Sequence, residues 1–324
     1  MAGKIVVTGA AGFIGSVLVG VLNDRDYKQL VLVDDFSRAD KEENWKDKTY
    51  ITTIDREAFE EWLQTYGDDV DFVFHLGART DTTEFDMDVF NHLNLDYTRR
   101  IWEVCVQKQI PLLYASSAAT YGLGEHGYKD DHSQVDALQP LNPYGWSKQH
   151  FDQWALRQEQ TPPWWGGIKF FNVYGPNEYH KGRMASVVLH AFRQIQATGM
   201  VKLFRSHNPD FEDGEQLRDF VYVLDAVDVL IWMMEVQPAC GLYNLGTGKA
   251  ETFLELARST FAALGQPENI AFIDTPEDIR DKYQYFTEAD MDKVRAAGYQ
   301  GEFRPLREGV RHYVQQFLLP GNYR

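Results

Sequence analysis

Two segments of the sequence carry side chains whose spacing suits proton transfer. Tyr144 and Lys148 form a YxxxK pattern, and an apolar run over residues 111–117 ends in two serines. Positions i and i+4 share one face of a helix, so the ammonium of Lys148 is expected to lie beside the phenol of Tyr144 and to lower its pKa. A serine hydroxyl at the end of this run is expected to hydrogen-bond the same substrate oxygen. Together these groups would move the proton that accompanies hydride transfer at a carbinol carbon.

A glycine turn near the N-terminus predicts the binding of a dinucleotide. The β-branched run at residues 4–8 is typical of a buried strand, and Gly9, Gly12 and Gly15 follow it before an apolar-periodic stretch. Gly9 allows the tight turn, Gly12 lets a pyrophosphate approach the backbone, and Gly15 lets the helix pack on the strand. The spacing is GxxGxxG, so its strength lies in the strand before it and the helix after it. Behind such a turn, the YxxxK pattern favours chemistry over helix packing with a surface lysine.

The segment after the next strand bears on the choice of cofactor. Residues 30–33 predict a strand that ends in Asp34, where an acid suits the unphosphorylated ribose of NAD. Arg38 and Lys41 follow in a polar stretch that is either a solvated loop or a site for the 2′-phosphate of NADP. This stretch alone therefore leaves the choice between NAD and NADP open.

A further apolar run, residues 70–78, is typical of a strand buried on both faces of a parallel sheet. Ligands gather beyond the carboxyl ends of such strands, so Gly77 and Ala78 are expected to border the cofactor. His75 lies inside the run, and we expect a hydrogen-bonded core residue there in preference to a catalyst.

The order of predicted elements indicates an α/β protein. Strands alternate with helices through the first half, which predicts a Rossmann-type, doubly wound parallel sheet with a smaller C-terminal substrate-binding domain. We expect a cofactor-binding domain at residues 1–167 and a mainly substrate-binding domain at residues 168–324, with segments that return to the sheet. In the second half, the pattern predicts a strand at 168–173 and helices ending near Thr198, at 253–264 and at 306–318.

Composition excludes several classes of function. The 324 residues carry a formal net charge of −16, which argues against nucleic acid as a partner, because its binding rests on clustered Lys and Arg. The two cysteines, Cys105 and Cys240, belong to no CxxC or Cys/His cluster, so neither a disulfide framework nor a metal site is expected. No leader pattern or membrane-spanning apolar stretch is present. We therefore expect a soluble cytoplasmic protein without a membrane partner.

Several motifs together resemble the extended short-chain dehydrogenase/reductase superfamily. They are Gly9-x-x-Gly12-x-x-Gly15, residues 116–122, Tyr144-x-x-x-Lys148 and residues 218–223. Within it, three further stretches resemble the ADP-L-glycero-D-manno-heptose 6-epimerases: residues 171–176 leading to 180–186, residues 244–248, and Tyr283-Gln284-x-Phe286-Thr287-x-Ala289-Asp290. Such enzymes are isomerases that invert one carbon of a nucleotide-linked heptose destined for the inner core of lipopolysaccharide.

The resemblance implies roles for individual side chains. Tyr144 and Lys181 would be the two acid/base groups, Lys148 would tune Tyr144 and bind the nicotinamide ribose, and Ser117 would hydrogen-bond the reacting oxygen. Tightly held NADP would take a hydride from C6 of ADP-D-glycero-D-manno-heptose and return it to the opposite face of a 6-ketone. Two acid/base groups on different segments are useful because the proton leaves and returns on different sides.

The resemblance also implies the binding sets. It implies NADP as the cofactor, although Asp34 left the choice between NAD and NADP open. Arg38 or Lys41 would then contact the 2′-phosphate. The implied cofactor contacts are Gly9, Gly12, Phe13, Ile14, Gly15, Asp34, Asp35, Arg38, Lys41, Gly77, Ala78, Asn94, Tyr144, Lys148, Val173 and Lys181. The implied substrate contacts are Ser117, Asn172, Arg183, His190, Phe204, Arg218 and Tyr283, with the planar fork of Arg218 suited to the diphosphate. A homo-oligomer is expected.

One departure and three alternatives remain beside this interpretation. The link over residues 205–217 is longer and more acidic than the resemblance implies, and we expect it to shape a substrate lid. A 4,6-dehydratase needs an acid pair where Ala118 and Ala119 stand, which disfavours that activity. Another nucleotide-sugar epimerase or reductase shares the fold. A non-catalytic NADP-sensing regulator is disfavoured by Ser117 and the YxxxK pair, which nucleotide binding alone does not need.

Overall fold

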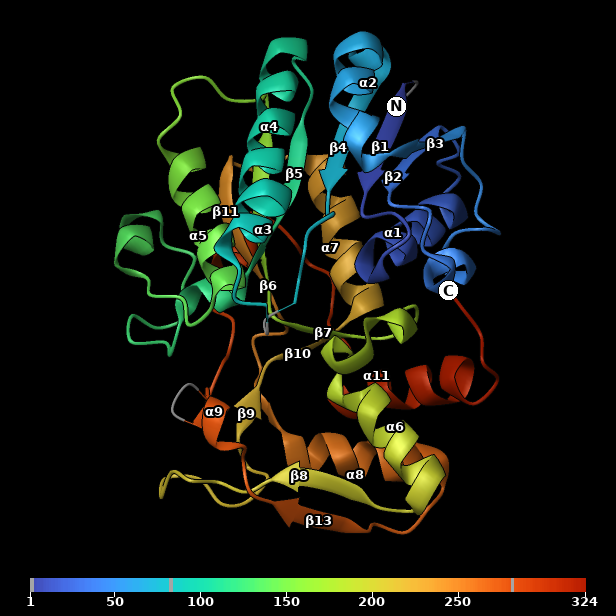
Figure 1. The fold of residues 1–324 in the computed structure, drawn as a ribbon, viewed down its shortest axis with the longest axis vertical. Helices are drawn as coiled ribbons and strands as arrows, with labels where there is room; N and C mark the ends of the chain where they lie inside the picture. The colour runs from blue at the N-terminus through green and yellow to red at the C-terminus, as the bar shows by residue number, and fades with distance from the viewer. Residues whose placement is uncertain (1–2, 82–83, 281–282) are drawn as a thin grey trace.

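The centre of the computed structural model is a seven-stranded parallel sheet (Figure 1). The structure describes residues 3–81, 84–280 and 283–324. In spatial order the strands are β11 (Gly241–Leu245), β6 (Trp165–Phe170), β5 (Leu112–Ser117), β4 (Val70–His75), β1 (Lys4–Thr8), β2 (Leu30–Asp34) and β3 (Thr52–Asp55). The order reverses between β1 and β4, which is where a doubly wound sheet binds its ligand. The predicted fold class is confirmed.

Helices cover both faces of the sheet because its strands present apolar side chains on both sides. Ile5 and Val7 pack in one core with α1 (Phe13–Asp24) and α7 (Val223–Val236). Val6 points to the opposite face. There it packs in a second core with residues of α2 (Phe59–Tyr66), α4 (Tyr97–Lys108) and α5 (Pro143–Leu156). This alternation is the period of two expected of a strand buried on both faces.

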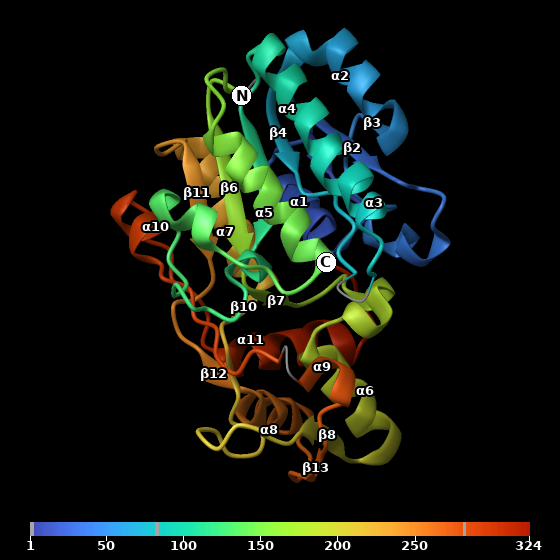
Figure 2. The same cartoon turned by 60° about the vertical axis from the view of Figure 1, so that its left-hand side comes forward.

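A second, smaller set of elements lies beyond the carboxyl ends of the strands (Figures 1 and 2). Helices α6 (Val187–Thr198) and α8 (Phe253–Leu264) pack over a two-stranded parallel sheet of β8 (Val201–Phe204) and β13 (Ile270–Ile273). Two other pairs join β7 (Asn172–Tyr174) to β10 (Phe220–Tyr222) and β9 (Leu217–Arg218) to β12 (Glu251–Thr252). The remaining helices are α3 (Met87–Phe90), α9 (Glu277–Arg280), α10 (Asp292–Ala296) and α11 (Leu306–Tyr313).

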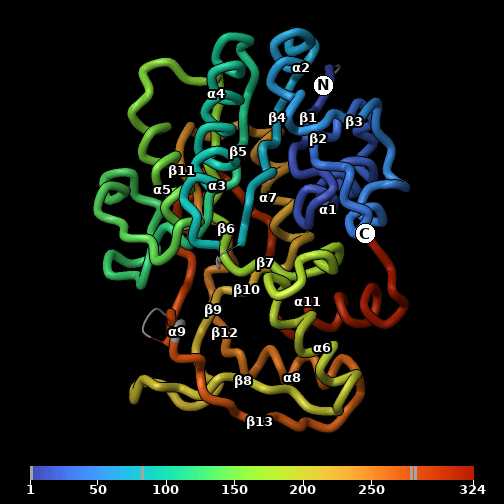
Figure 3. Tube along the Cα trace, in the orientation of Figure 1, coloured from blue at the N-terminus to red at the C-terminus, as the bar shows by residue number. Residues whose placement is uncertain are grey.

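The C-terminus returns to the first helix, as the trace in Figure 3 shows. Arg324 forms an ion pair with Asp24 at the end of α1, and its backbone N–H donates to the side chain of Asn177 at 2.8 Å. Within the described ranges, no helix is both long and apolar enough to cross a membrane.

Two predicted elements differ from the observed ones. The strand predicted over 168–173 is divided at Phe171, because β6 pairs with β11 in the large sheet whereas β7 pairs with β10 outside it. The helix predicted over 306–318 is α11 followed by a wider π-helical turn at Val314–Leu318. The helices predicted at 253–264 and to Thr198 are confirmed by α8 and α6.

Candidate active site

The glycine turn forms a backbone cradle at the start of α1. A Cβ at Gly15 would meet the carbonyl oxygen of Gly9 at 2.2 Å, and one at Gly9, whose φ is +69°, would meet the amide nitrogen of Gly77 at 2.8 Å. Gly12 caps the helix without a side chain, and the first turn holds no acidic residue. The backbone N–H groups of Phe13 and Ile14 therefore remain for an anion, and the turn fits the pyrophosphate of a dinucleotide.

Asp34 is already engaged by the protein. Its carboxylate accepts the backbone N–H groups of Ala11 (3.0 Å) and Asp35 (2.8 Å) and pairs with the ammonium of Lys41 at 2.9 Å. Arg38 pairs with the neighbouring Asp40. Of the two basic residues predicted here, Lys41 is thus the one that pairs with the carboxylate at the strand end.

The chain that follows β4 packs directly against the backbone of the glycine turn. Gly77 donates its N–H to the Thr8 hydroxyl at 3.0 Å, and Ala78 follows it. The His75 ring bonds the hydroxyls of Thr8 (2.9 Å) and Thr98 (3.0 Å), and burial lowers the pKa of His75 to about 3. The prediction that His75 is a hydrogen-bonded core residue is confirmed.

Asn94 lies in a π-helical turn, Asn91–Asp96, that precedes α4. Its amide bonds both the N–H and the carbonyl of Arg79, at 2.8 and 3.0 Å, and it donates to the hydroxyl of Ser147 on α5 at 3.0 Å. Asn94 therefore ties the chain after β4 to the helix that carries the YxxxK pair.

The YxxxK pair begins helix α5 as predicted. Asn142 caps the helix by accepting the Gly145 N–H at 2.8 Å. Burial raises the pKa of Tyr144, and a hydrogen bond with Ser117 opposes that rise. The Lys148 ammonium donates to the carbonyl of Ala115 at 2.7 Å, and burial lowers the pKa of Lys148 to about 8.

The expected lowering of the Tyr144 pKa by Lys148 is therefore wrong for this structure. The desolvation of the phenol outweighs the groups that favour its ionised form. Ser117 and Tyr144 are nevertheless brought together, as the sequence predicted.

Lys181 comes from a different segment, the short helical turn Tyr179–Met184. Its ammonium lies 5.5 Å from the centre of the Phe13 ring, which places it at the glycine turn. Burial lowers the pKa of Lys181, and the nearby carboxylate of Glu178 opposes this change. Glu178 is fully buried and accepts the N–H and hydroxyl of Ser186 at 2.5 and 2.6 Å. This carboxylate holds the segment that carries Lys181 to the start of α6.

Five of the predicted substrate residues form two groups. Arg218 is buried with its guanidinium 5.5 Å from the ring of Tyr283 and 5.4 Å from that of Phe253, and the ring of Phe204 lies 6.3 Å from Tyr283. In the second group, His190 on α6 faces the carbonyl of Arg183 at 3.3 Å.

Asn172 and Val173 lie in β7, which pairs with β10 just after Arg218. Asn172 is exposed, and its backbone N–H donates to the carbonyl of Asp219 at 3.0 Å.

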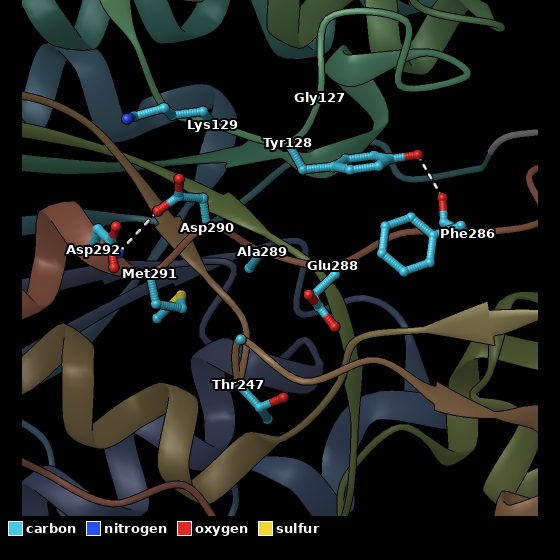
Figure 4. Close-up of a pocket in the computed structure, with 11 residues that line it drawn as sticks. Gly127, Tyr128, Lys129, Thr247, Phe286, Glu288, Ala289, Asp290, Met291 and Asp292 are labelled. Atoms are coloured by element: carbon cyan, nitrogen blue, oxygen red, sulfur yellow. Dashed lines mark hydrogen bonds between the residues drawn. The ribbon is translucent and has the colours of Figure 1, made fainter.

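Two cavities open near the smaller set of elements. One of about 370 Å³ is lined by Tyr283 and by Phe211 of the 205–217 link, whose ring lies 5.3 Å from that of Tyr285. A second, of about 660 Å³, is shown in Figure 4, where Tyr128 reaches across to the carbonyl of Phe286 at 2.5 Å. None of the predicted site residues lines the second cavity, whereas the first contains a predicted substrate residue.

Among the buried charged residues that the sequence-based prediction missed are Asp152, Lys169 and Glu178. A signal for Asp152 was present, because it follows Lys148 by four residues and Tyr144 by eight on the same helix face. Lys169 and Glu178 offered none, since an isolated charge in a strand or loop is normally solvated.

The comparisons with known proteins agree with this geometry. A model of the NAD dependent epimerase/dehydratase family matches residues 5–246. The ADP-L-glycero-D-manno-heptose-6-epimerase of Fusobacterium nucleatum is 47% identical, over 97% of this chain and 98% of that protein. The solved structure of the Helicobacter pylori ADP-L-glycero-D-manno-heptose-6-epimerase superimposes with a TM-score of 0.81 at 28% identity, over 97% and 96% of the two chains.

A further solved structure bears on the cofactor. MoeE5, in complex with UDP-glucose and NAD, is 27% identical, with a TM-score of 0.76 over 97% of this chain and 98% of that one. A nicotinamide cofactor is thus common to the matched family and to this neighbour. On the family model and the near full-length relatives, the chain belongs to the ADP-L-glycero-D-manno-heptose-6-epimerases of the NAD dependent epimerase/dehydratase family.

Proposed function

We propose that this protein inverts C6 of ADP-D-glycero-D-manno-heptose and yields the L-glycero epimer, a step in the synthesis of the lipopolysaccharide inner core. The observation that carries the proposal is the 47% identity, over nearly the whole chain, with a protein of that name. The residues that the chemistry needs, Ser117, Tyr144, Lys148 and Lys181, stand at the carboxyl edge of the sheet or at the glycine turn.

The side chains divide the proton transfers between two places. A bound nicotinamide cofactor supplies the hydride acceptor and donor at C6. Burial raises the pKa of Tyr144, and the positive charge of an oxidised nicotinamide bound beside the phenol would oppose that rise. Tyr144, hydrogen-bonded to Ser117, exchanges a proton with the C6 oxygen in one orientation of the heptose. Lys181 exchanges it in the other, after the 6-ketone has rotated.

The binding sets belong to the same proposal. Arg218 would hold the diphosphate, since a buried guanidinium with a planar fork matches phosphate oxygens. Tyr283 lies against Arg218, and Phe204 packs on Tyr283. Phe211 of the 205–217 link shares a cavity with Tyr283, as a segment that closes over substrate would.

We propose NADP as the cofactor, and the pairing of Asp34 supports this choice. A carboxylate that already accepts two backbone N–H groups and an ammonium is less available to a ribose hydroxyl. The partly buried ammonium of Lys41 stands at the strand end, where a 2′-phosphate would find it.

Replacing Lys41 by methionine is expected to weaken NADP binding by about 10- to 100-fold, the effect of one lost charge-assisted contact, and to favour NAD. Cofactor affinities measured by calorimetry on stripped protein check this result. Lys46→Met is the matched control, because Lys46 lies on the same segment but pairs with Glu43 at the surface. An unchanged preference in Lys41→Met would remove Lys41 from the phosphate site.

The function is tested by incubating the purified protein, without added cofactor, with ADP-D-glycero-D-manno-heptose. We expect inversion at C6 and the release of NADP on denaturation, identified by mass. UDP-glucose, offered in parallel, should remain unchanged. Conversion of UDP-glucose with no reaction of the heptose would replace this proposal with a UDP-sugar epimerase.

A further inference from the structure

A fully buried ion pair lies behind the candidate active site. The Lys169 ammonium is 2.7 Å from the carboxylate of Asp152, and the two side chains are 1% and 0% exposed. Strand β6, which pairs with β5 in the large sheet, supplies Lys169, and helix α5 supplies Asp152. Burying two charges is costly, and an apolar pair is often as stable, so packing alone is a weak reason for this pair.

Asp152 faces the acid/base residues on its own helix. It follows Tyr144 by eight positions and Lys148 by four, so the three side chains share one helix face. Its carboxylate also accepts the hydroxyls of Tyr114 at 2.9 Å and Ser116 at 2.7 Å, both on β5. Asp152 therefore ties the helix with the YxxxK pair to the strand that ends in Ser117.

Lys169 is linked to Ser117 through the hydroxyl of Thr120. Its ammonium donates to the Thr120 hydroxyl at 2.7 Å, and that hydroxyl donates to the carbonyl of Ser117 at 2.8 Å. The ring of Tyr121 lies 5.1 Å from the ammonium. A single buried cation thus contacts both the carboxylate on α5 and the turn that follows Ser117.

We propose that Lys169 is a positioning residue: paired with Asp152, it fixes Ser117 against Tyr144 and balances the negative charge buried beneath them. Lys169 touches neither substrate nor cofactor in this role, and acts through Asp152 and Thr120. The inference deepens the proposed function and rests on it only where activity is the readout.

Several charged and titratable groups surround the Lys169–Asp152 pair, and its two charges act on their pKa values. They are Tyr144 and Lys148 on α5, Tyr114 on β5, Tyr121 after it, and His132 and Asp130 from the segment beside β11. The negative charge of Asp152 raises the pKa of both Tyr144 and Lys148. The positive charge of Lys169, on the same carboxylate, offsets that effect.

Substitution of the two partners should therefore move the ionisation of Tyr144 in opposite directions. Lys169→Met leaves an unbalanced carboxylate and is expected to raise the pKa of Tyr144 by about one pH unit. Asp152→Asn should lower it by a similar amount. The double variant, which removes both charges, should return close to the wild-type value, and so should Lys169→Arg.

The readout is the ultraviolet titration of tyrosinate. For each protein, the titration of the same protein with Tyr144→Phe added is subtracted, which leaves the contribution of Tyr144. This titration needs no substrate, so it decides the inference even if the epimerase proposal fails. The pH profile of epimerisation should shift in the same order. Similar shifts in both single variants, or none in either, would overturn the inference. If Lys169→Met does not fold, the comparison of Asp152→Asn with the double variant decides it.

Discussion

Replacing Tyr144 by phenylalanine is expected to lower the epimerase rate by about 10²- to 10⁴-fold, the range for loss of one positioned acid/base group. The ring keeps its place 6.4 Å from Phe90, so only the hydroxyl that meets Ser117 is lost. The rate of C6 inversion under saturating substrate, measured by NMR, checks this result. The bound cofactor should remain, because phosphate binding depends on the glycine turn.

Tyr66→Phe is the matched control for this experiment. Tyr66 is exposed at the end of α2, and the loss of its hydroxyl should leave the rate unchanged. A non-catalytic cofactor sensor would show no effect of either substitution on its cofactor affinity and no inversion in the wild type. Full activity of Tyr144→Phe would remove Tyr144 from the chemistry.

Replacing Lys181 by methionine is expected to lower the full epimerisation by a similar factor of about 10²- to 10⁴-fold. The methionine chain fills the same space beside Phe13 but cannot exchange a proton. Tyr144 is still present, so one epimer should reduce the bound cofactor while the other does not. Nicotinamide absorbance after the addition of each epimer measures this asymmetry.

Lys249→Met controls for the loss of a lysine as such, because Lys249 is exposed and pairs with Glu251 away from the glycine turn. If Lys181→Met interconverted the epimers at the wild-type rate, the assignment of two acid/base groups would be wrong. If it responded equally to both epimers but interconverted them slowly, Lys181 would act in binding alone.

The sheet could be predicted because its signals are local. Gly9, Gly12 and Gly15 are required because neighbouring backbone leaves no room for a Cβ. A Cβ at Gly12 or Gly15 would meet the carbonyl oxygen of Gly9, and one at Gly9 would meet the amide nitrogen of Gly77. The β-branched runs of β1 and β2 are buried on both faces, which leaves a continuous apolar pattern. The YxxxK pair was equally local, since one turn of α5 brings its members to one face.

What the sequence did not reveal depends on contacts between distant segments. Helix α7 is buried on most of its faces, so it lacks the polar stripe that marks an amphipathic helix. The division of the strand predicted at 168–173 follows from pairing with β10, about fifty residues later. The pairs Lys169–Asp152 and Lys41–Asp34 join separate elements, and the bond from Lys148 to Ala115 competes with the phenol that it was expected to approach.

The central claim is that one bound cofactor takes a hydride from C6 and returns it to the same carbon. The most direct test repeats the conversion with ADP-D-glycero-D-manno-heptose that carries deuterium at C6, in ordinary water and without added cofactor. The account predicts that the L-glycero product keeps its deuterium at C6, because hydride never exchanges with solvent. Product with hydrogen from water at C6 would contradict it, since inversion would then proceed by removal of a proton from carbon.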